Sequence, residues 1–382
     1  MLHRLTKSLL VLALSCLLAF GFAGRAWALP ELVVDMRTGE VLYQEDAGVP
    51  WHPASLTKLM TALVTFNAIA NGRVSLDSLV TVSRRALAEP PSKVGLPVDT
   101  GMTLEVALNL MIVKSANDIA VAVAERVSGS VEKFVDEMNQ MASVLGLSAT
   151  HFINPNGLDD ARQTVSARDL AILTLAIRRN FPQYADLFRT SVVKLGNKDL
   201  ESNNNLLTEF AGTDGMKTGF ICAAGLNMVV TVDRNGRQLL VVVLGASSAR
   251  ERGEKAAQLL TEALNGELRG TGKSVFDIPN LTRMAPPNMR TSLCGPDAKT
   301  YVANQEAAFP YGLDGQPTFL QDSIPPLTYR ASTLGRVREV PLPLPRPASA
   351  PLLRQSIVAT PQINVGNSTI PLPRPRPAWL GG

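Results

Sequence analysis

The sequence predicts a mixed α/β fold, in which an antiparallel β-sheet is flanked by helices and accompanied by a helical subregion. Residues 31–45 contain two short strand-like runs, and β-rich runs return after Gly215. Between them, from about residue 55 to residue 180, apolar residues recur at helical spacing. Because the strands enclose a helical middle, we expect the first hairpin and the later strands to form one sheet with helices on its faces.

The first 28 residues have the pattern of a secretory signal peptide. Arg4 and Lys7 precede an almost unbroken apolar run at 8–23, and Ala26-Trp27-Ala28 supplies small residues for cleavage after Ala28. An uncleaved membrane anchor is the alternative, but a run of this length falls short of the ~30 Å hydrocarbon core of a bilayer. We therefore expect an exported chain, periplasmic or extracellular.

The elements that follow can be placed in order. Residues 31–45 read as a hairpin that turns at Arg37-Thr38-Gly39. A helix follows Pro53 and Ser55 and stops at Asn71-Gly72, and it is apolar on nearly every face, so it should be buried. Two more apolar helical runs, 103–113 and 119–127, are separated by the polar residues 115–118, where Ser and Asn can cap the second helix.

The rest of the folded part alternates between helix and strand. Amphipathic helices are expected at 130–146, 166–180 and 251–266. The runs GMKTGF, GLNMVVTVDR and RQLLVVVLGA are strand-like, and Asn235-Gly236 is a strong signal for a tight turn between the last two. Residues 29–270 are therefore predicted to form one folded domain.

The composition changes after residue 270. Eighteen of the 26 prolines lie there, and the near-repeat PLPRP occurs at 343–347 and again at 371–375. Proline removes backbone donors, and the segment lacks apolar periodicity. We expect residues 271–382 to form a basic, largely disordered tail that could engage an envelope polymer, a lipid surface or a protein partner.

Charge and cysteine usage exclude some classes of function. The formal net charge is +4, and the body shows no concentrated basic patch with interleaved aromatic residues, so nucleic acid is not an expected partner. No His/Cys cluster has metal-ligand spacing, and no metal or other cofactor is expected. Cys222 and Cys294 can form a disulfide in an oxidising compartment, but the sequence does not show whether they meet.

The spacing Ser-x-x-Lys, which can join a nucleophile to its base, occurs at Ser55, Ser130 and Ser191. Ser130 starts an amphipathic helix, where an N-cap role explains it. Ser191 lies in a β-branched run with no helix to orient its hydroxyl. Ser55 begins a buried helix and shares a face with Lys58 one turn later. A lysine in that place must pair, reach solvent or act in catalysis.

A lysine acts as a base only when it is neutral, which at a pKa near 10.4 costs about 4.6 kcal/mol at pH 7. Burial and a neighbouring cation both lower that pKa. The one Lys-Thr-Gly of the chain, Lys217-Thr218-Gly219, provides such a cation at the start of the β-rich region. Lys217 and Thr218 could also attract a substrate carboxylate, and Gly219 would let backbone approach closely.

The third polar motif is Ser115-Ala116-Asn117, in the break between two buried helices. Ser-x-Asn also occurs at 202–204, so the motif is weak by itself. In the order Ser-x-x-Lys, Ser-x-Asn, Lys-Thr-Gly, however, the three are typical of penicillin-interacting serine enzymes. Together with PASLTKLMTA, HFINPNGL, SARDLA and AAGLNMVV, they make residues 32–264 resemble the serine D-alanyl-D-alanine carboxypeptidases, the low-molecular-mass penicillin-binding proteins.

The resemblance implies a β-lactamase/transpeptidase-like fold, with residues 29–270 as the serine D,D-peptidase catalytic domain, and a role for each motif residue. Ser55 would be the acylated nucleophile, Lys58 its general base and Ser115 a proton relay to the leaving group. The implied substrate-binding residues are Asn117, Lys217, Thr218, Gly219, Phe220 and Arg252, with Arg250 as an alternative to Arg252. Backbone N–H groups of Ser55 and Phe220 would form the oxyanion hole.

The expected activity is removal of the terminal D-alanine from peptidoglycan stem peptides, with β-lactams as covalent inhibitors at Ser55. A β-lactamase would need a group that activates the deacylating water, and HFINPNGLDDARQ offers only Asp159 and Asp160. A D,D-endopeptidase and a non-catalytic wall-associated scaffold are further alternatives. The apolar run Phe220-Ile221-Cys222 departs from more polar relatives, which leaves substrate preference open and places Cys222 close to the site.

Overall fold

The computed structural model describes residues 29–337, 362–365 and 368–371 of the 382-residue chain. The predicted signal peptide and most of the residues after 337 lie outside the described residues. Strands β12 (Gln362–Val365) and β13 (Ser368–Pro371) pair with each other in antiparallel fashion. Within the described residues, no helix is both long enough and apolar enough to cross a membrane.

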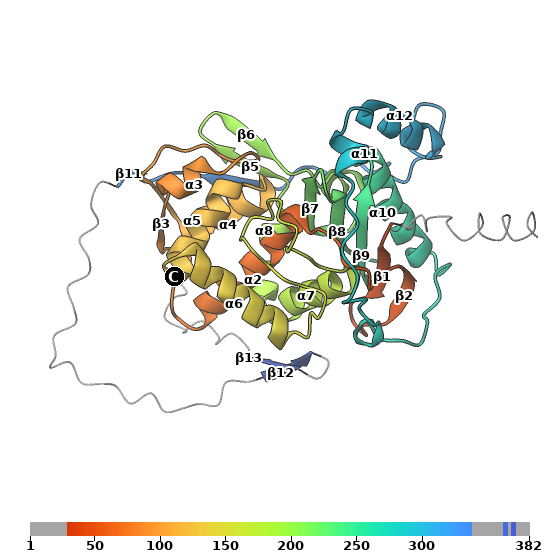
Figure 1. The fold of residues 1–382 in the computed structure, drawn as a ribbon, viewed down its shortest axis with the longest axis horizontal. Coiled ribbons are helices and arrows are strands. Elements are labelled where there is room, and N and C mark those ends of the chain that lie inside the picture. The colour runs from red at the N-terminus through yellow and green to blue at the C-terminus, as the bar shows by residue number, and fades with distance from the viewer. Residues whose placement is uncertain (1–28, 338–361, 366–367, 372–382) are drawn as a thin grey trace, which may run out of the picture.

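A five-stranded antiparallel sheet forms the centre of the molecule (Figure 1). Its spatial order is β2-β1-β9-β8-β7, so the N-terminal hairpin joins the later strands by pairing β1 with β9. The predicted mixed α/β fold with one antiparallel sheet is therefore confirmed. The strands are β1 Glu31–Asp35, β2 Val41–Glu45, β7 Thr213–Ile221, β8 Gly225–Arg234 and β9 Arg237–Ala246.

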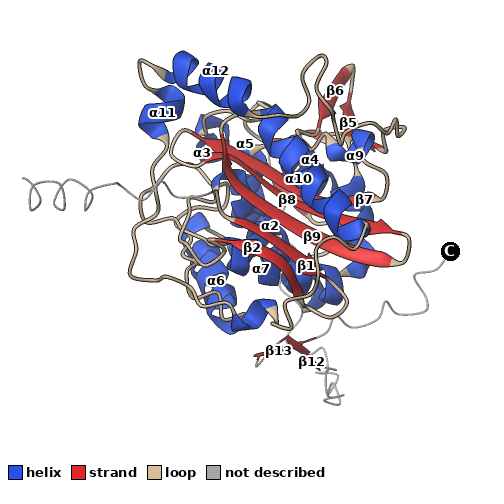
Figure 2. Ribbon diagram, turned by 90° about the vertical axis from the view of Figure 1, so that its right-hand side faces the viewer, coloured by secondary structure: helices blue, strands red, loops and turns tan. Residues whose placement is uncertain are grey.

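Alternate residues of the sheet are buried on opposite faces. In β8, Met228 and Val230 pack with α10 (Ala249–Leu264), whereas Val229 belongs to the larger core on the other side. Figure 2 shows α10 crossing one face of the sheet while α2 (Thr57–Ala70) and α7 (Ala167–Asn180) lie behind the other. Because both faces are covered, the strands are continuous apolar runs rather than alternating ones.

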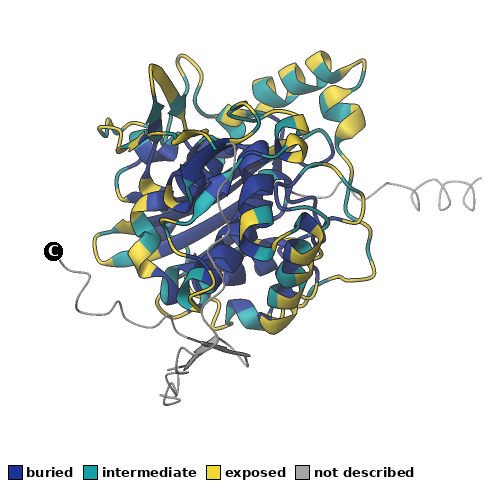
Figure 3. Cartoon of the chain, turned by 90° about the vertical axis from the view of Figure 1, so that its left-hand side faces the viewer, coloured by how far each residue is buried: buried dark blue, intermediate teal, exposed yellow. Residues whose placement is uncertain are grey.

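The helical subregion is built around α5 (Asn117–Ser128), which packs against α2 and three further helices. Those three are α3 Arg84–Ala88, α4 Leu104–Val113 and α6 Val131–Val144. All fourteen residues of α2 except Asn67, Ile69 and Ala70 are buried, which confirms the prediction of a central apolar helix. The burial is visible in Figure 3, where the sheet and the inner helices are dark and the outer helices carry the exposed residues.

The smaller elements form the margins of the fold. One three-stranded sheet has the order β10-β5-β6 and another the order β11-β4-β3. Their strands are β3 Leu79–Thr81, β4 Thr100–Thr103, β5 Val192–Leu195, β6 Lys198–Glu201, β10 Thr328–Ala331 and β11 Gly335–Arg336. The short helices are α8 Ala185–Arg189, α9 Leu206–Glu209, α11 Arg290–Cys294 and α12 Ala298–Ala308.

The C-terminal segment corrects one prediction. A disordered tail was expected from residue 271, but residues 271–337 pack against the body of the protein. Strand β10 pairs in parallel with β5 and β11 pairs with β4, so the segment fills two sheet edges. Phe319 and Leu320 pack against the apolar cluster under α10. The prolines of this segment lie in the connections between its helices and strands. Its apolar side chains pack one at a time against a core that residues 29–270 form, so the segment has no helical or strand-like apolar periodicity in its sequence.

Cys222 and Cys294 form a disulfide, with their Cα atoms 5.8 Å apart. The bond joins the end of β7 to α11, across 72 residues of sequence. It is the strongest single attachment of the C-terminal segment to the body. Constraining the unfolded chain over a loop of this length is worth about 4 kcal/mol in the chain-entropy treatment.

Candidate active site

A cavity of about 630 Å³ opens between β7, the start of α2 and the connection from α4 to α5. Seven of the nine residues predicted for the site line it, and they come from four separate parts of the chain. These are Ser55, Ser115, Asn117, Thr218, Gly219, Phe220 and Arg252. The other two, Lys58 and Lys217, are buried and do not belong to the lining. The fold thus brings all three motifs to one place.

Ser55 lies in a single 3₁₀ turn, Ala54–Leu56, that leads directly into α2. The preceding residue, Ala54, has φ +48°, a left-handed conformation that L-residues rarely adopt. Gly157 lies against this turn, and a Cβ atom on that glycine would overlap the carbonyl oxygen of Ala54. The turn that orients Ser55 is therefore enclosed by neighbouring backbone.

Lys58 is completely buried, and its amine has three oxygen neighbours. Nζ lies 2.9 Å from Ser55 Oγ, 2.8 Å from Asn117 Oδ1 and 2.6 Å from the carbonyl oxygen of Asn156. Amide and peptide oxygens can only accept. A neutral amine has two N–H groups for these two acceptors, and its lone pair then faces the Ser55 hydroxyl, which is the arrangement a general base needs.

The electrostatics favour that neutral form. Burial, followed by repulsion from Lys217, lowers the pKa of Lys58 well below its usual value. Lys217 is itself perturbed, because burial and then Arg252 lower its pKa to about 7. Burial lowers the pKa of Arg252 to about 10, which leaves the guanidinium charged at neutral pH. The predicted effect of a second cation on Lys58 is confirmed in direction.

The Ser-x-Asn motif lies at the junction of α4 and α5. Asn117 is the first residue of α5. Its Oδ1 accepts a hydrogen bond from Lys58 Nζ, and its Nδ2 donates to the carbonyl oxygen of Pro90 at 2.9 Å. Ser115 is almost buried at 5% exposure, has φ +61° and faces the cavity. Its hydroxyl has no hydrogen-bond partner among residues 29–337. It is therefore available to a ligand.

The prediction that Ser or Asn would cap the second helix is wrong. Ala116 occupies the N-cap position of α5, and no side chain accepts a hydrogen bond there. The left-handed backbone at Ser115 turns its hydroxyl toward the cavity instead of along the helix axis. The side chains of Ser115 and Asn117 therefore both face the cavity and do not cap the helix.

Strand β7 brings the Lys-Thr-Gly motif against Ser55. A Cβ atom at Gly219 would lie 2.9 Å from the backbone nitrogen of Ser55, so only glycine permits this approach. Lys217 Nζ donates to the carbonyl of Thr218 at 3.0 Å and lies behind the cavity wall. Phe220, half exposed at 51%, forms part of the cavity rim.

The structure distinguishes the two candidate arginines. Arg250 donates to the carbonyls of Glu306 and Tyr311 and stacks over the ring of Phe309, so it is committed to the C-terminal segment. Arg252 donates from Nη2 to the carbonyl of Asn203 at 2.8 Å, and its buried Nε has no partner among residues 29–337. Both arginines line the cavity, and each has a buried Nε without a hydrogen-bond partner among residues 29–337. Because both terminal nitrogens of Arg250 already donate to carbonyls of the C-terminal segment, Arg252 is the better candidate for binding a carboxylate.

The other two Ser-x-x-Lys pairs have structural explanations. Ser130 caps α6 by accepting from the backbone nitrogen of Lys133, as its position in the sequence indicates. Ser191 Oγ donates to the carbonyl of Leu327 in the C-terminal segment. Of the second Ser-x-Asn, Ser202 and Asn203 also line the cavity, on the side of Arg252.

The sequence of the central residues also agrees with known proteins. A family profile described as D-alanyl-D-alanine carboxypeptidase matches residues 26–248, more than half of the chain. The chain belongs to the D-alanyl-D-alanine carboxypeptidase family. The matched range contains the Ser-x-x-Lys, Ser-x-Asn and Lys-Thr-Gly motifs and ends shortly before Arg252.

Individual members of the D-alanyl-D-alanine carboxypeptidase family match over the same part. DacD of Escherichia coli K12 is 36% identical over 236 residues, which is 60% of this chain and 61% of that protein. DacF of Bacillus subtilis 168 is 32% identical over 240 residues, 61% of each. The chain thus spans about 61% of the length of these curated relatives.

Solved structures of penicillin-binding proteins share the fold. Penicillin-binding protein 5 from Haemophilus influenzae superimposes with a TM-score of 0.59 at 31% identity, covering 62% of this chain and 70% of that one. Penicillin-binding protein D2 from Listeria monocytogenes in its cefotaxime-bound form gives 0.55 at 31% identity, covering 61% and 95%. The segment after residue 248, including the disulfide partner Cys294, lies outside the family match.

One contributor to the site of this D-alanyl-D-alanine carboxypeptidase family member was missed. The main chain of Asn156 accepts from Lys58, while its side chain donates to Glu89 Oε2 at 2.9 Å. The local signal was the turn-forming run Asn154-Pro155-Asn156-Gly157, in which Asn154 Oδ1 accepts from Gly157. A backbone acceptor has no side-chain signature, so its role is visible only in three dimensions.

Proposed function

We propose that this chain is a serine-type D-Ala-D-Ala carboxypeptidase that removes the terminal D-alanine from peptidoglycan stem pentapeptides through an acyl-enzyme on Ser55. The observation that carries the proposal is the fully buried Lys58 amine, 2.9 Å from Ser55 Oγ and held by two oxygens that only accept. Family membership and the order of the three motifs support the same reaction.

In the first step, Ser55 Oγ attacks the carbonyl carbon of the D-Ala-D-Ala bond while Lys58 takes the hydroxyl proton. The tetrahedral intermediate then expels the terminal D-alanine, whose nitrogen receives a proton through the Ser115 hydroxyl. Water then attacks the ester carbonyl and gives one proton to Lys58; the bond to Ser55 Oγ breaks, the shortened peptide leaves with a carboxyl group, and Lys58 returns the proton to the serine oxygen. Asn117 orients Lys58 through Oδ1 in the free enzyme, and we assign it also to the substrate amide.

The terminal carboxylate of the substrate is assigned to the Thr218 hydroxyl and Arg252, with Lys217 behind them as a source of positive potential. The backbone N–H groups of Ser55 and Phe220 are assigned to the oxyanion hole. The close approach of Gly219 to the Ser55 nitrogen supports this pairing. Phe220 follows Gly219 in β7, so its N–H group can approach the same substrate carbonyl as that of Ser55.

The same assignment extends to inhibitors and location. β-Lactams are proposed to acylate Ser55 and to be released slowly. The chain is proposed to act on the cell wall from an exported position, with residues 29–270 as the catalytic domain. A partner for the residues after 337 stays a prediction.

The alternative of a β-lactamase gains no support from the two aspartates that were considered. Asp159 is ion-paired with Arg290, and Asp160 with Arg162. Neither Asp159 nor Asp160 lines the cavity that contains Ser55. We therefore assign neither carboxylate to the activation of a deacylating water.

Release of D-alanine tests the proposed activity. The purified chain should liberate D-alanine from a pentapeptide ending in D-Ala-D-Ala, and fluorescent penicillin should label it on the peptide that contains Ser55. Labelling elsewhere, or no release of D-alanine by a penicillin-reactive protein, would contradict the proposal. Analysis of cross-linked muropeptides in the same experiment separates carboxypeptidase from D,D-endopeptidase activity.

Activity should fall as the pH rises above about 7, because Lys217 then loses its charge and attracts the substrate carboxylate less. Titration of Lys217 does not destabilise the fold in this range: an unfolded lysine keeps its proton to about pH 10.5, so the contribution of Lys217 to the free energy of unfolding rises with pH. We expect kcat/KM to have an alkaline limb that is flattened in Lys217→Arg. A limb of the same shape in wild type and variant would contradict this role.

A further inference from the structure

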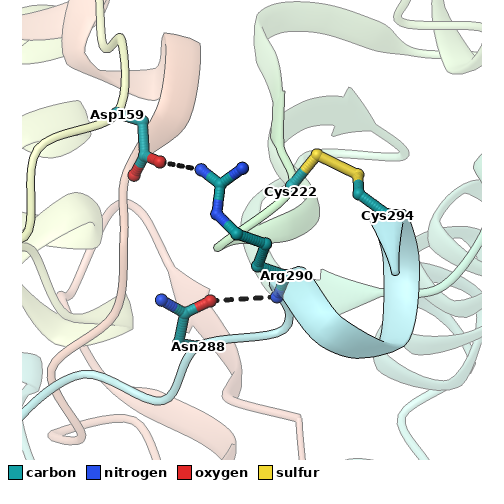
Figure 4. Close-up of a disulfide and its surroundings, with 5 residues drawn as sticks. All are labelled: Asp159, Cys222, Asn288, Arg290 and Cys294. Atoms are coloured by element: carbon teal, nitrogen blue, oxygen red, sulfur yellow. Dashed lines mark hydrogen bonds and ion pairs between the residues drawn. A yellow bond between two sulfur atoms is a disulfide. The ribbon is translucent and has the colours of Figure 1, made fainter. Parts of the chain in front are cut away.

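The end of β7 is joined to a part of the chain that lies outside the family match. Cys222 follows Ile221 directly, and both Phe220 and Ile221 line the cavity. Its disulfide partner Cys294 belongs to α11 (Figure 4). A contribution of residues 288–294 to the substrate site would therefore be specific to chains that carry this segment.

Residues 288–294 make two further polar contacts, each with a residue that lies outside the cavity lining but close in sequence to a lining residue. The backbone nitrogen of Met289 donates to the carbonyl of Ala223 at 3.0 Å, next to the disulfide. The guanidinium of Arg290 pairs with Asp159, as Figure 4 shows. Asp159 follows Leu158, which lines the cavity. We call the Arg290–Asp159 pair, with the disulfide that anchors it, the rim bridge.

The proposed function gives the direction in which a substrate must run, and the inference rests on that function. The terminal carboxylate is held at Thr218 and Arg252, and the reacting carbonyl lies at Ser55 beside Gly219. The rest of the stem peptide must then continue past Phe220 and Ile221. At about 3.3 Å per residue in an extended chain, the amino acid before the acyl D-alanine reaches the level of Cys222 and the rim bridge.

The charges at this end of the cavity differ from those at the other. The carboxylate end is cationic and buried, whereas the rim bridge carries one positive and one negative group in reach of solvent. The side chains of Arg290 and Asp159 are 53% and 38% exposed. The stem residue that arrives there is a diamino acid. If its side chain ends in both a carboxylate and an ammonium, as in diaminopimelate, the carboxylate can pair with Arg290 and the ammonium with Asp159.

We propose that Arg290 and Asp159 are specificity-determining residues for the diamino acid of the stem peptide, with Arg290 binding its distal carboxylate and Asp159 its distal ammonium. A stem that contains diaminopimelate is then preferred over one that contains lysine, which offers the ammonium alone. An exposed ion pair adds little to the stability of a fold, so its removal should leave the protein folded.

Two pentapeptides that differ only in the distal carboxylate test the proposal, one with diaminopimelate and one with lysine. With the full chain, Arg290→Gln should lower kcat/KM for the diaminopimelate peptide by about fivefold, the upper value for one exposed charged contact, and change the lysine peptide by less than twofold. Asp159→Asn should lower kcat/KM for both. Arg85→Gln removes a similarly exposed ion pair with Glu132 and should change neither.

The possible outcomes separate the subsite from the reaction. Equal losses on both peptides in Arg290→Gln would overturn the proposal, because they would indicate a structural role. A short acyl-D-Ala-D-Ala without a diamino acid reports the reaction alone: if it is not hydrolysed and penicillin does not label Ser55, the proposed function fails instead. Cys222→Ser/Cys294→Ser should lose the preference as Arg290→Gln does. Retention of the preference would overturn the anchoring role of the disulfide.

Discussion

Replacing Ser55 with alanine should abolish acylation and with it all turnover. The hydroxyl that lies 2.9 Å from the buried Lys58 amine is then lost, and among the described residues the other hydrogen-bond partners of that amine are an amide and a peptide oxygen, which are not nucleophiles. Loss of an activated serine removes a whole catalytic step, so we expect release of D-alanine to fall by more than about 10⁴-fold. Fluorescent penicillin labelling and D-alanine release measure the effect directly.

Ser130→Ala is the matched control for that change. Ser130 begins the same Ser-x-x-Lys spacing, but its hydroxyl caps α6 by accepting from Lys133. Its loss should lower the free energy of unfolding by about 1 kcal/mol and leave labelling unchanged. Labelling that survives Ser55→Ala, or disappears in Ser130→Ala without unfolding, would show that the nucleophile has been wrongly assigned.

Replacing Lys58 with methionine should have an effect nearly as large. Methionine has a similar length, but its thioether sulfur is far too weak a base to take a proton, so the Ser55 hydroxyl loses the group that deprotonates it. A positioned base contributes typically 10² to 10⁴ in rate, and we expect acylation by penicillin to slow by about 10³-fold. The acylation rate should be measured over a range of penicillin concentrations, so that binding and chemistry separate.

The melting temperature of Lys58→Met shows whether the slower acylation comes from loss of the base or from destabilisation of the fold. Asn117 Oδ1 and the carbonyl of Asn156 lose their donor, which destabilises the fold, while the penalty for a buried amine disappears. The two effects oppose each other, so the melting temperature should change little. Lys133→Met, at the exposed lysine of the Ser130 pair, is the control. Penicillin acylation within tenfold of wild type in Lys58→Met would rule out Lys58 as the base.

Much of the fold could be predicted because its signals are local. The hairpin at 31–45, the apolar helix after Ser55 and the strands on either side of Asn235-Gly236 all depend on periodicity or turn residues within about ten positions. The helix junction at Ser115 was located correctly, but the capping was wrong. Whether a polar side chain caps a helix or faces a cavity depends on the backbone angle, which is left-handed at Ser115.

The site could be predicted only in part, for a related reason. Spacing placed Lys58 on the face of Ser55, and chemistry required a second cation, which Lys217 supplies with its pKa lowered to about 7. The carbonyl of Asn156 completes the surroundings of Lys58 without any side-chain signal. The choice of Arg252 over Arg250 depends on contacts with residues 306–311, far away in the sequence.

The sequence by itself determined the elements of this protein and the chemistry of its three motifs, because periodicity, turn residues and side-chain types act within one or two turns of chain. Only the tertiary structure decided that Cys222 meets Cys294, that residues 271–337 fill the edges of β4 and β5, and that Arg290 reaches Asp159. These contacts join segments that the chain brings together only on folding. Their partners are chosen by the packing of the whole core, and no short stretch of sequence contains that information.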